Sequence, residues 1–447
     1  MAADEAETLL ADLIAKAKAA GADAADALLV DQSSLSVTFR LGRPEKVERS
    51  EAGDVGLRVL IGKHQAFVSS SDRSVQALAE LVERAVAMAR AVPEDPYCGL
   101  ADPAQLARDF PVLDICDPTE PSTEQLVDWA KRAEDAARAV RGVTNSEGAD
   151  AGWGRSKVAL VASNGFSHSY SVSSAQISAA VLAGDAAGGM ERDYDFSSAV
   201  YAADLRSPED IGQGAGHRAV ERLGARKART AKLPVVFDPR VSRSFLGHLA
   251  GAINGGAITR GTSFLKDSLG AQIFADGVTI TDDPHRQRGL RSKPCDGEGI
   301  ANRRRALIDA GTLTTWLLDL RSARQLGLET TGHAARGVGS PPSPSVTNLW
   351  MEPGAITPAE MIFDIPEGFY VTELFGMGVN GVTGDYSRGA AGFWIKGGEI
   401  AYPVSEVTVA GNLKEMFREL TPANDLVWRY GTDAPTVRID GMTIAGA

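Results

Sequence analysis

The chain has 447 residues, of which 44% are hydrophobic and 23% are charged, an ordinary composition for a globular protein of two or three domains. Its formal net charge of −12 is spread along the chain. This argues against sequence-independent binding to nucleic acid, which needs clustered lysine and arginine. The three widely spaced cysteines fit neither a disulfide framework nor a zinc-knuckle spacing.

The sequence shows no pattern of a membrane span or an export signal. The longest stretch without Asp, Glu, Lys or Arg, residues 158–184, is rich in serine and interrupted by Asn164–Gly165, so it is too polar to cross a bilayer. The first residues are acidic where a secretory signal would be basic. We therefore expect a cytoplasmic protein without membrane contact.

The first hundred residues combine helical and strand patterns. Apolar residues at helical spacing predict helices, and short runs that meet at glycine turns predict strands. In chain order, the expected elements are a helix over 4–19, strands over 36–40, 55–61 and 65–68, and a helix over 74–91. A connector rich in proline and aspartate then runs over 93–121.

Two further helices are predicted from their start signals. Ser122 and Gln125 have the spacing of a capping box, in which the serine caps the helix and the glutamine reaches back, so a helix should run from there to about Val140. Ser207–Pro208 is an N-cap followed by a first-turn proline, and it predicts a helix that ends near Gly224.

One hairpin signal stands between these two helices. Asn164–Gly165 favours a tight turn, because both residues tolerate the left-handed backbone that such turns need. It should join strands over 157–162 and 166–172. No repeat of fixed period is evident.

The second half of the chain is expected to be rich in strands. The predicted elements after the basic segment 227–232 are a strand over 233–237, a helix from Val241, a hairpin over 392–403 that turns at 396–398, and a helix over 412–419. Within the hairpin, Phe393, Trp394, Ile400 and Tyr402 should help to pack the sheet. The chain lacks the regular βαβ alternation of a doubly wound sheet. We therefore predict an α+β fold with domains over 1–228 and 229–447.

The densest polar cluster in the sequence comprises Asp282, Asp283, His285, Asp296 and Glu298. Carboxylates with one histidine could hold a hard cation such as Mg²⁺ or Ca²⁺. Asp–Asp–Pro is also common turn chemistry, since aspartate side chains bond their own backbone, and we favour the turn interpretation. The other single histidines, His64, His168, His217 and His333, are expected on the surface or in hairpins.

Nucleophile signals are weak. No G-x-S-x-G motif occurs. Cys295 has Asp296 beside it, and an adjacent carboxylate opposes the thiolate form, so a structural cysteine is the simpler interpretation. We expect no catalytic residue in this chain.

The best remaining candidate lies on a glycine-rich turn. Gly376, Gly378 and Gly381 form G-x-G-x-x-G, but the residues that follow do not read as a helix, so a phosphate loop is not expected. The polar residues of this turn could bind an extended peptide backbone or a partner chain, or could bond within the turn itself. They are Asn380, Thr383, Asp385 and Ser387.

Long stretches of this sequence resemble one family. The run GMGVNGVTGDYSRGAAGFWIKGGEIAYPVSEVTVAGNLKEMF from Gly376 is similar to the C-terminal signature of the TldD/PmbA family, formerly called modulators of DNA gyrase. Other stretches that resemble the family are residues 37–72, 223–239, 263–284, CDGEGI at 295–300 and TTGHAARG at 330–337, where His333 stands in place of an expected asparagine. The resemblance implies an N-terminal domain like an α/β sandwich and a C-terminal domain built on a strongly curved, barrel-like mixed sheet.

The same resemblance also indicates whether this chain should bind zinc. TldD-type members carry HExxxH on a central helix, where two imidazoles reach one zinc ion. Here His248 lies in the corresponding region but is followed by Leu249, and no second histidine lies within two turns. The chain therefore resembles the PmbA/TldE type, without a metal site of its own, and the zinc is expected on a partner.

Three functions remain open from the sequence. The resemblance implies a non-catalytic subunit in a heterodimer with a TldD-type paralogue, whose zinc cleaves unfolded peptides such as peptide-antibiotic precursors or an antitoxin. The second is an autonomous metal-dependent peptidase that uses the cluster from Asp282 to Glu298. The third is a homodimeric protein that binds peptides without cleaving them.

Overall fold

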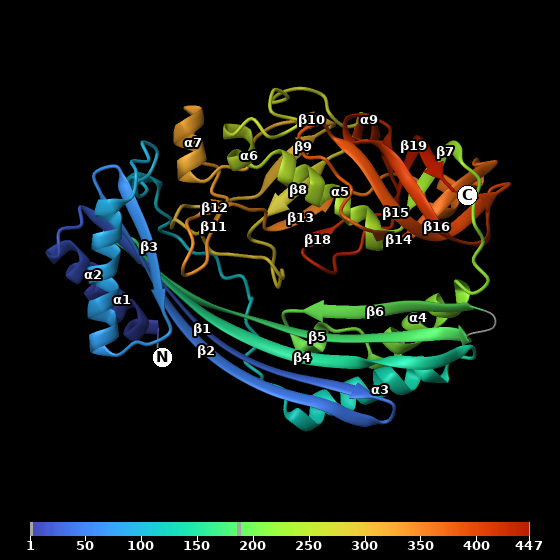
Figure 1. The fold of residues 1–447 in the computed structure, drawn as a ribbon, viewed down its shortest axis with the longest axis horizontal. Coiled ribbons are helices and arrows are strands. Elements are labelled where there is room, and N and C mark those ends of the chain that lie inside the picture. The colour runs from blue at the N-terminus through green and yellow to red at the C-terminus, as the bar shows by residue number, and fades with distance from the viewer. Residues whose placement is uncertain (1–2, 186–188, 447) are drawn as a thin grey trace.

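The computed structural model describes residues 3–185 and 189–446. A long, curved sheet forms the N-terminal half, and the strand-rich C-terminal half lies over its concave face (Figure 1). The sheet has six antiparallel strands in the order β3-β2-β1-β4-β5-β6. Their bounds are β1 Ala24–Arg40, β2 Arg43–Ile61, β3 His64–Ser70, β4 Val143–Ala162, β5 Ser167–Asp185 and β6 Gly189–Ala199.

The predicted turns join these strands. Leu41–Gly42 and Gly62 take positive φ between β1, β2 and β3, and Gly165, at φ 95°, turns β4 into β5. The strands are much longer than expected, since β1 and β2 pair from Ala24↔Leu60 to Arg40↔Arg43. The missed part of β2, residues 43–52, is exposed along its whole length, so neither alternation nor an apolar run marks it in the sequence.

Four helices cover the convex face of this sheet. They are α1 Ala3–Ala19, α2 Val75–Ala91, α3 Thr123–Ala139 and α4 Pro208–Glu221. The first pair packs on odd-numbered residues of β1 such as Leu29, and the second pair packs on Leu35 and Val37 of the same strand face. The capping box of Ser122 and Gln125 and the Ser207 cap are present as predicted.

A closed barrel is the centre of the C-terminal half. Strands β7 Ala231–Phe237, β14 Glu367–Phe375, β15 Asp385–Lys396, β16 Glu399–Asn412 and β19 Val437–Ala445 pair in a ring that β16 and β19 close. Helix α5, Pro239–Ala252, adds Phe245, Leu246 and Leu249 to the barrel core, which also holds Phe237 and Trp394. The predicted barrel-like sheet and the α+β class are therefore confirmed. The predicted hairpin turns at Gly397–Gly398, but Ile400 is exposed and takes no part in packing.

Smaller elements surround the barrel. A second sheet contains β10 Thr312–Leu313, β9 Arg305–Asp309, β8 Ile280–Asp283, β13 Asn348–Met351 and β18 Thr432–Asp433. The short remaining elements are α6 Gly255–Thr259, α7 Leu320–Leu326, α8 Pro358–Phe363, α9 Leu413–Arg418, β11 Ala334–Ala335, β12 Ser343–Pro344, β17 Leu420–Pro422 and the 3₁₀ turns Pro103–Gln105 and Ala202–Asp204. Among the helices of the described residues, none is long and apolar enough to cross a membrane.

Ion pairs join the two halves at opposite ends of the long sheet. At the end near α1 and α2, the Asp26 carboxylate of β1 bonds Arg58 of β2 and also Arg336 of the C-terminal half, and all three side chains are buried.

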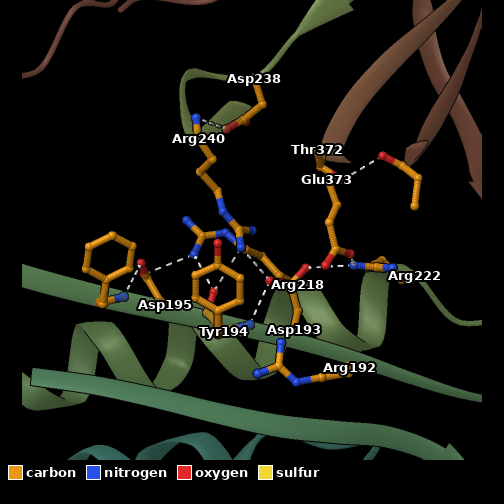
Figure 2. A network of polar contacts seen from close by, with 12 residues as sticks. Arg192, Asp193, Tyr194, Asp195, Arg218, Arg222, Asp238, Arg240, Thr372 and Glu373 are labelled. Carbon is orange, nitrogen blue, oxygen red and sulfur yellow. Dashed lines mark hydrogen bonds and ion pairs between the residues drawn. The ribbon is translucent and has the colours of Figure 1, made fainter. Parts of the chain in front are cut away.

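The other junction involves β6 and α4 (Figure 2). There Arg240 of α5 lies 2.9 Å from Asp193 and stacks over Tyr194, with its guanidinium carbon 4.5 Å from the ring centroid. Arg222 at the end of α4 contacts both Asp193 and Glu373 of β14. We call Asp193, Arg222, Arg240 and Glu373 the Asp193 junction.

Candidate functional site

The region that would carry a zinc motif lies where α5 meets β15. His248 of α5 packs edge-on against Tyr386 of β15, with 6.0 Å between ring centroids. Neither His248 Nε2 nor the Tyr386 hydroxyl has a hydrogen-bond partner within the described part of the chain, and Tyr386 is only 1% exposed. Burial and then the charge of Arg388 lower the pKa of His248, so its ring is neutral at physiological pH.

These residues do not fit a zinc ion. A catalytic zinc site needs three protein ligands, and across residues 3–185 and 189–446 no three His, Cys, Asp or Glu side chains gather in a way that could hold a metal. The neighbours of His248 are a tyrosine and a guanidinium, and a fixed positive charge disfavours a dication beside it. This region therefore offers a neutral imidazole and a tyrosine hydroxyl beside a fixed positive charge.

Of the predicted contact residues, Asn380 and Thr383 lie on the exposed turn that leads into β15, and Asp385 and Ser387 lie at the start of β15 itself. Asn380 Oδ1 accepts hydrogen bonds from the backbone N–H groups of Val382 and Thr383. Thr383 Oγ1 donates to Asp385 at 2.6 Å, and this bond, followed by one from Asn412, lowers the pKa of Asp385. The Ser387 backbone N–H donates to Gly378.

Most polar groups of this turn are thus used to hold its own shape. Beside its exposed polar residues, the segment presents three exposed apolar side chains, Phe375, Met377 and Val382, and Met377 is 95% exposed. The turn also contacts the segment that follows α6, since Phe264 donates its backbone N–H to the carbonyl oxygen of Gly381. Contact between Asn380, Thr383, Asp385 or Ser387 and a peptide or partner stays a prediction.

Within the described residues the acidic cluster seen in the sequence forms no group that could hold a metal ion, and its carboxylates bond protein groups instead. Asp283 Oδ1 accepts from the His285 backbone N–H, as in an Asx turn, and Asp282 accepts from the backbone and hydroxyl of Thr347. Asp296 accepts three backbone N–H groups, and Glu298 accepts one from Leu320. Burial raises the pKa of both Asp296 and Glu298. Asp283 and Asp296 bond backbone groups within a few residues, as the turn interpretation predicts, whereas Asp282 and Glu298 bond Thr347 and Leu320 from more distant segments.

Cys295 and His333 lie next to residues of this acidic cluster. Burial, reinforced by Asp296, raises the pKa of the Cys295 thiol to about 12, which leaves it protonated and unreactive. His333, expected on the surface or in a hairpin, directly precedes β11, which forms a short hairpin with β12, but its side chain does not lie on the surface. Its ring is buried, with Nε2 3.3 Å from Asp282 and Nδ1 2.8 Å from the Thr331 hydroxyl.

Sequence reasoning missed the Asp193 junction. Its only local signal is the alternation of Glu191, Asp193 and Asp195, which places three carboxylates on one face of a strand. Their arginine partners are distant in sequence, so nothing in the pattern indicates which cations they meet.

Three family profiles match, described as PmbA/TldA metallopeptidase domain 1 over residues 25–89, the central domain over 116–223 and the C-terminal domain over 230–446. The chain is 40% identical to the metalloprotease PmbA of Escherichia coli O157:H7 over 426 residues, covering 95% of this chain and 92% of that protein. A PmbA homolog of Haemophilus influenzae is 35% identical and covers 96% and 93%.

Solved structures agree. The crystal structure of a protein described as a modulator of DNA gyrase from Bacteroides thetaiotaomicron superposes with a TM-score of 0.92 at 26% identity, over the full length of both chains. TldE from Thermococcus kodakarensis has the same fold, with a TM-score of 0.85 at 19% identity over 98% of this chain and 100% of that one. This chain therefore belongs to the PmbA/TldD metallopeptidase family.

Proposed function

We propose that this chain is the PmbA/TldE-type, non-catalytic subunit of a cytoplasmic heterodimer. Its partner is a TldD-type paralogue with HExxxH, whose zinc cleaves unfolded peptides such as peptide-antibiotic precursors or an antitoxin. The observation that carries the proposal is the chemistry around His248. One neutral imidazole, followed by Leu249 and flanked by Tyr386 and Arg388, replaces the two histidines and the glutamate that a zinc peptidase needs.

The exposed turn before β15 supports a partner surface. Phe375, Met377 and Val382 place three apolar side chains in solvent within eight residues of chain. Exposed apolar groups that cluster in this way are typical of protein–protein contacts. The rigid hydrogen bonding of Asn380 and Asp385 would keep the turn in one shape before the partner binds.

The test is a mild affinity purification of the chain from its own cells, followed by mass spectrometry. Near-stoichiometric recovery of a paralogue that bears HExxxH is expected, and peptide hydrolysis should appear only with that paralogue present. Met377→Asp should reduce the recovery, while Phe363→Asp on α8, another apolar site that is 80% exposed, should not. Hydrolysis by the isolated chain at a rate that the partner does not change would refute the proposal. Recovery of this chain only with itself would favour a homodimeric peptide-binding protein.

A further inference from the structure

A cavity of about 430 Å³ lies between the concave face of the long sheet and the segment 290–293 of the C-terminal half. Its volume falls within the range of ligand pockets in proteins. The sheet contributes residues of β1, β2, β4 and β5, and the segment covers them from the other side. The lining residues are Gln32, Ser33, Ser34, Ser50, Ala52, Gly154, Arg155, Ser156, Val158, Tyr170, Val172, Ser173, Ser174, Leu290, Arg291, Ser292 and Lys293. We call this space the Lys293 cavity.

The charge of the cavity is opposite to that of the chain. The chain has a net charge of −12, yet the lining of the Lys293 cavity contains three basic residues and no carboxylate. Two of the three are engaged, since Arg155 donates to the carbonyl oxygens of residues 117 and 118 and Arg291 donates to the Thr432 hydroxyl. The third, Lys293, makes no hydrogen bond or ion pair through its ammonium group within the described residues.

Lys293 is therefore a partly buried cation whose ammonium group makes no direct contact with a carboxylate among the described residues. Burial, and then the charge of Arg291, lower its pKa, while the charges of Asp296 and Asp282 act in the opposite direction. Buried charges in proteins are normally paired, because an unpaired one loses its hydration without compensation. An anionic group in the cavity would supply the missing partner.

Neutral donors line the same space. The hydroxyls of Ser34, Ser50, Ser156 and Ser174 come from four neighbouring strands, and none of them hydrogen-bonds another described residue. The Tyr170 hydroxyl is also without a partner in the described chain, and burial raises its pKa, so it remains a donor. One free ammonium with several hydroxyls matches a singly charged group better than a phosphate, which usually gathers more than one cation.

We propose that the Lys293 cavity binds a carboxylate of a peptide, either its C-terminus or an acidic side chain, through the Lys293 ammonium and the surrounding hydroxyls. This inference rests on the proposed function for the peptide nature of the ligand. The cavity lies on the sheet of this chain, so the chain itself holds one end of a substrate whose cleavage occurs on the partner.

The test compares two versions of one fluorescent pentapeptide, with a free C-terminal carboxylate or with a C-terminal amide and no acidic side chain. Binding is measured by fluorescence anisotropy on the full chain, alone and in the complex recovered with its partner. Lys293→Met should weaken binding of the free acid about tenfold or more, the value of a hydrogen bond to a charged group. It should leave the amide unchanged. Lys293→Arg should restore most of the affinity, and Lys266→Met, at an exposed lysine, is the matched control.

A second arm tests the site without a peptide. Acetate and inorganic phosphate are titrated separately, and acetylation of Lys293 by acetic anhydride is followed by mass spectrometry, with Lys266 as reference. Protection of Lys293 by acetate and by the free-acid peptide supports the proposal. Protection by phosphate alone, equal binding of the acid by the Met variant, or no protection by any of these probes overturns it. None of these results bears on recovery of the HExxxH paralogue, so the proposed function can stand or fail independently.

Discussion

Removing the central carboxylate of the Asp193 junction should loosen the attachment between the two halves. Asp193 is 3% exposed and serves both Arg222 and Arg240, whose side chains are also mostly buried. Breaking a buried ion pair by removing one partner costs about 3–5 kcal/mol. In Asp193→Asn, Arg222 keeps Glu373 and Glu191, while Arg240 loses its only carboxylate partner in the junction. We therefore expect the lower end of the range, about 3 kcal/mol.

The matched control is Asp195→Asn. Asp195 is similarly buried and pairs with Arg206 and Arg218, but both arginines belong to the N-terminal half. Both variants should lower the urea midpoint, and only Asp193→Asn should separate the halves. The assay is limited trypsin digestion, because the connection between the halves, residues 226–232, is rich in lysine and arginine. The reasoning would be refuted if Asp195→Asn accelerated cleavage there as much as Asp193→Asn, or if Asp193→Asn had wild-type stability.

Three further outcomes are expected. Burial raises the folded-state pKa of Glu298 above its usual 4.5, so the folded state holds a proton that the unfolded state releases, and the free energy of unfolding should fall as pH rises above about 4.5. Glu298→Gln should flatten that decline, measured by urea unfolding between pH 5 and 9. An unchanged slope would contradict the assignment. Ser122→Ala removes the cap of α3 and should cost about 1 kcal/mol in the same assay, whereas no loss would mean that the capping box contributes nothing. The Cys295 thiol, with its pKa raised to about 12, should react with a disulfide reagent at pH 8 only as fast as the protein unfolds, and rapid labelling of the native protein would show that it is accessible and ionised.

Local signals predicted the parts of the fold that short segments determine by themselves. The Ser122 cap, the Ser207 cap and the Asn164–Gly165 turn depend on backbone groups within a few residues, so the sequence contains their whole cause. The exposed half of β2 could not be recognised, because pairing with β1 rather than an apolar pattern makes it a strand.

The candidate sites also divide into residues that a local sequence signal reveals and residues whose surroundings come from distant segments. The turn residues Asn380 and Asp385 were found because polar side chains on a glycine-rich segment are visible in the sequence, although their hydrogen bonds within the turn were not. Lys293 was missed because its environment comes from β1, β2, β4 and β5, more than a hundred residues away in the chain. Burial of His333 depends in the same way on Asp282.

The two ion-paired junctions restrict how a ligand can reach the Lys293 cavity. Asp26 with Arg336 fastens one end of the long sheet to the C-terminal half, and Asp193 with Arg240 fastens the other, while the cavity is lined by Gln32, Ser33 and Ser34 in the middle of β1. Because both ends are fixed, the two halves cannot open by a hinge rotation about one end, since that rotation would break the charged contacts at the other end. A ligand must therefore enter the cavity laterally, between the strands and segment 290–293. The association rate of the ligand should then depend on the width of that lateral passage and on ionic strength, and not on domain motion.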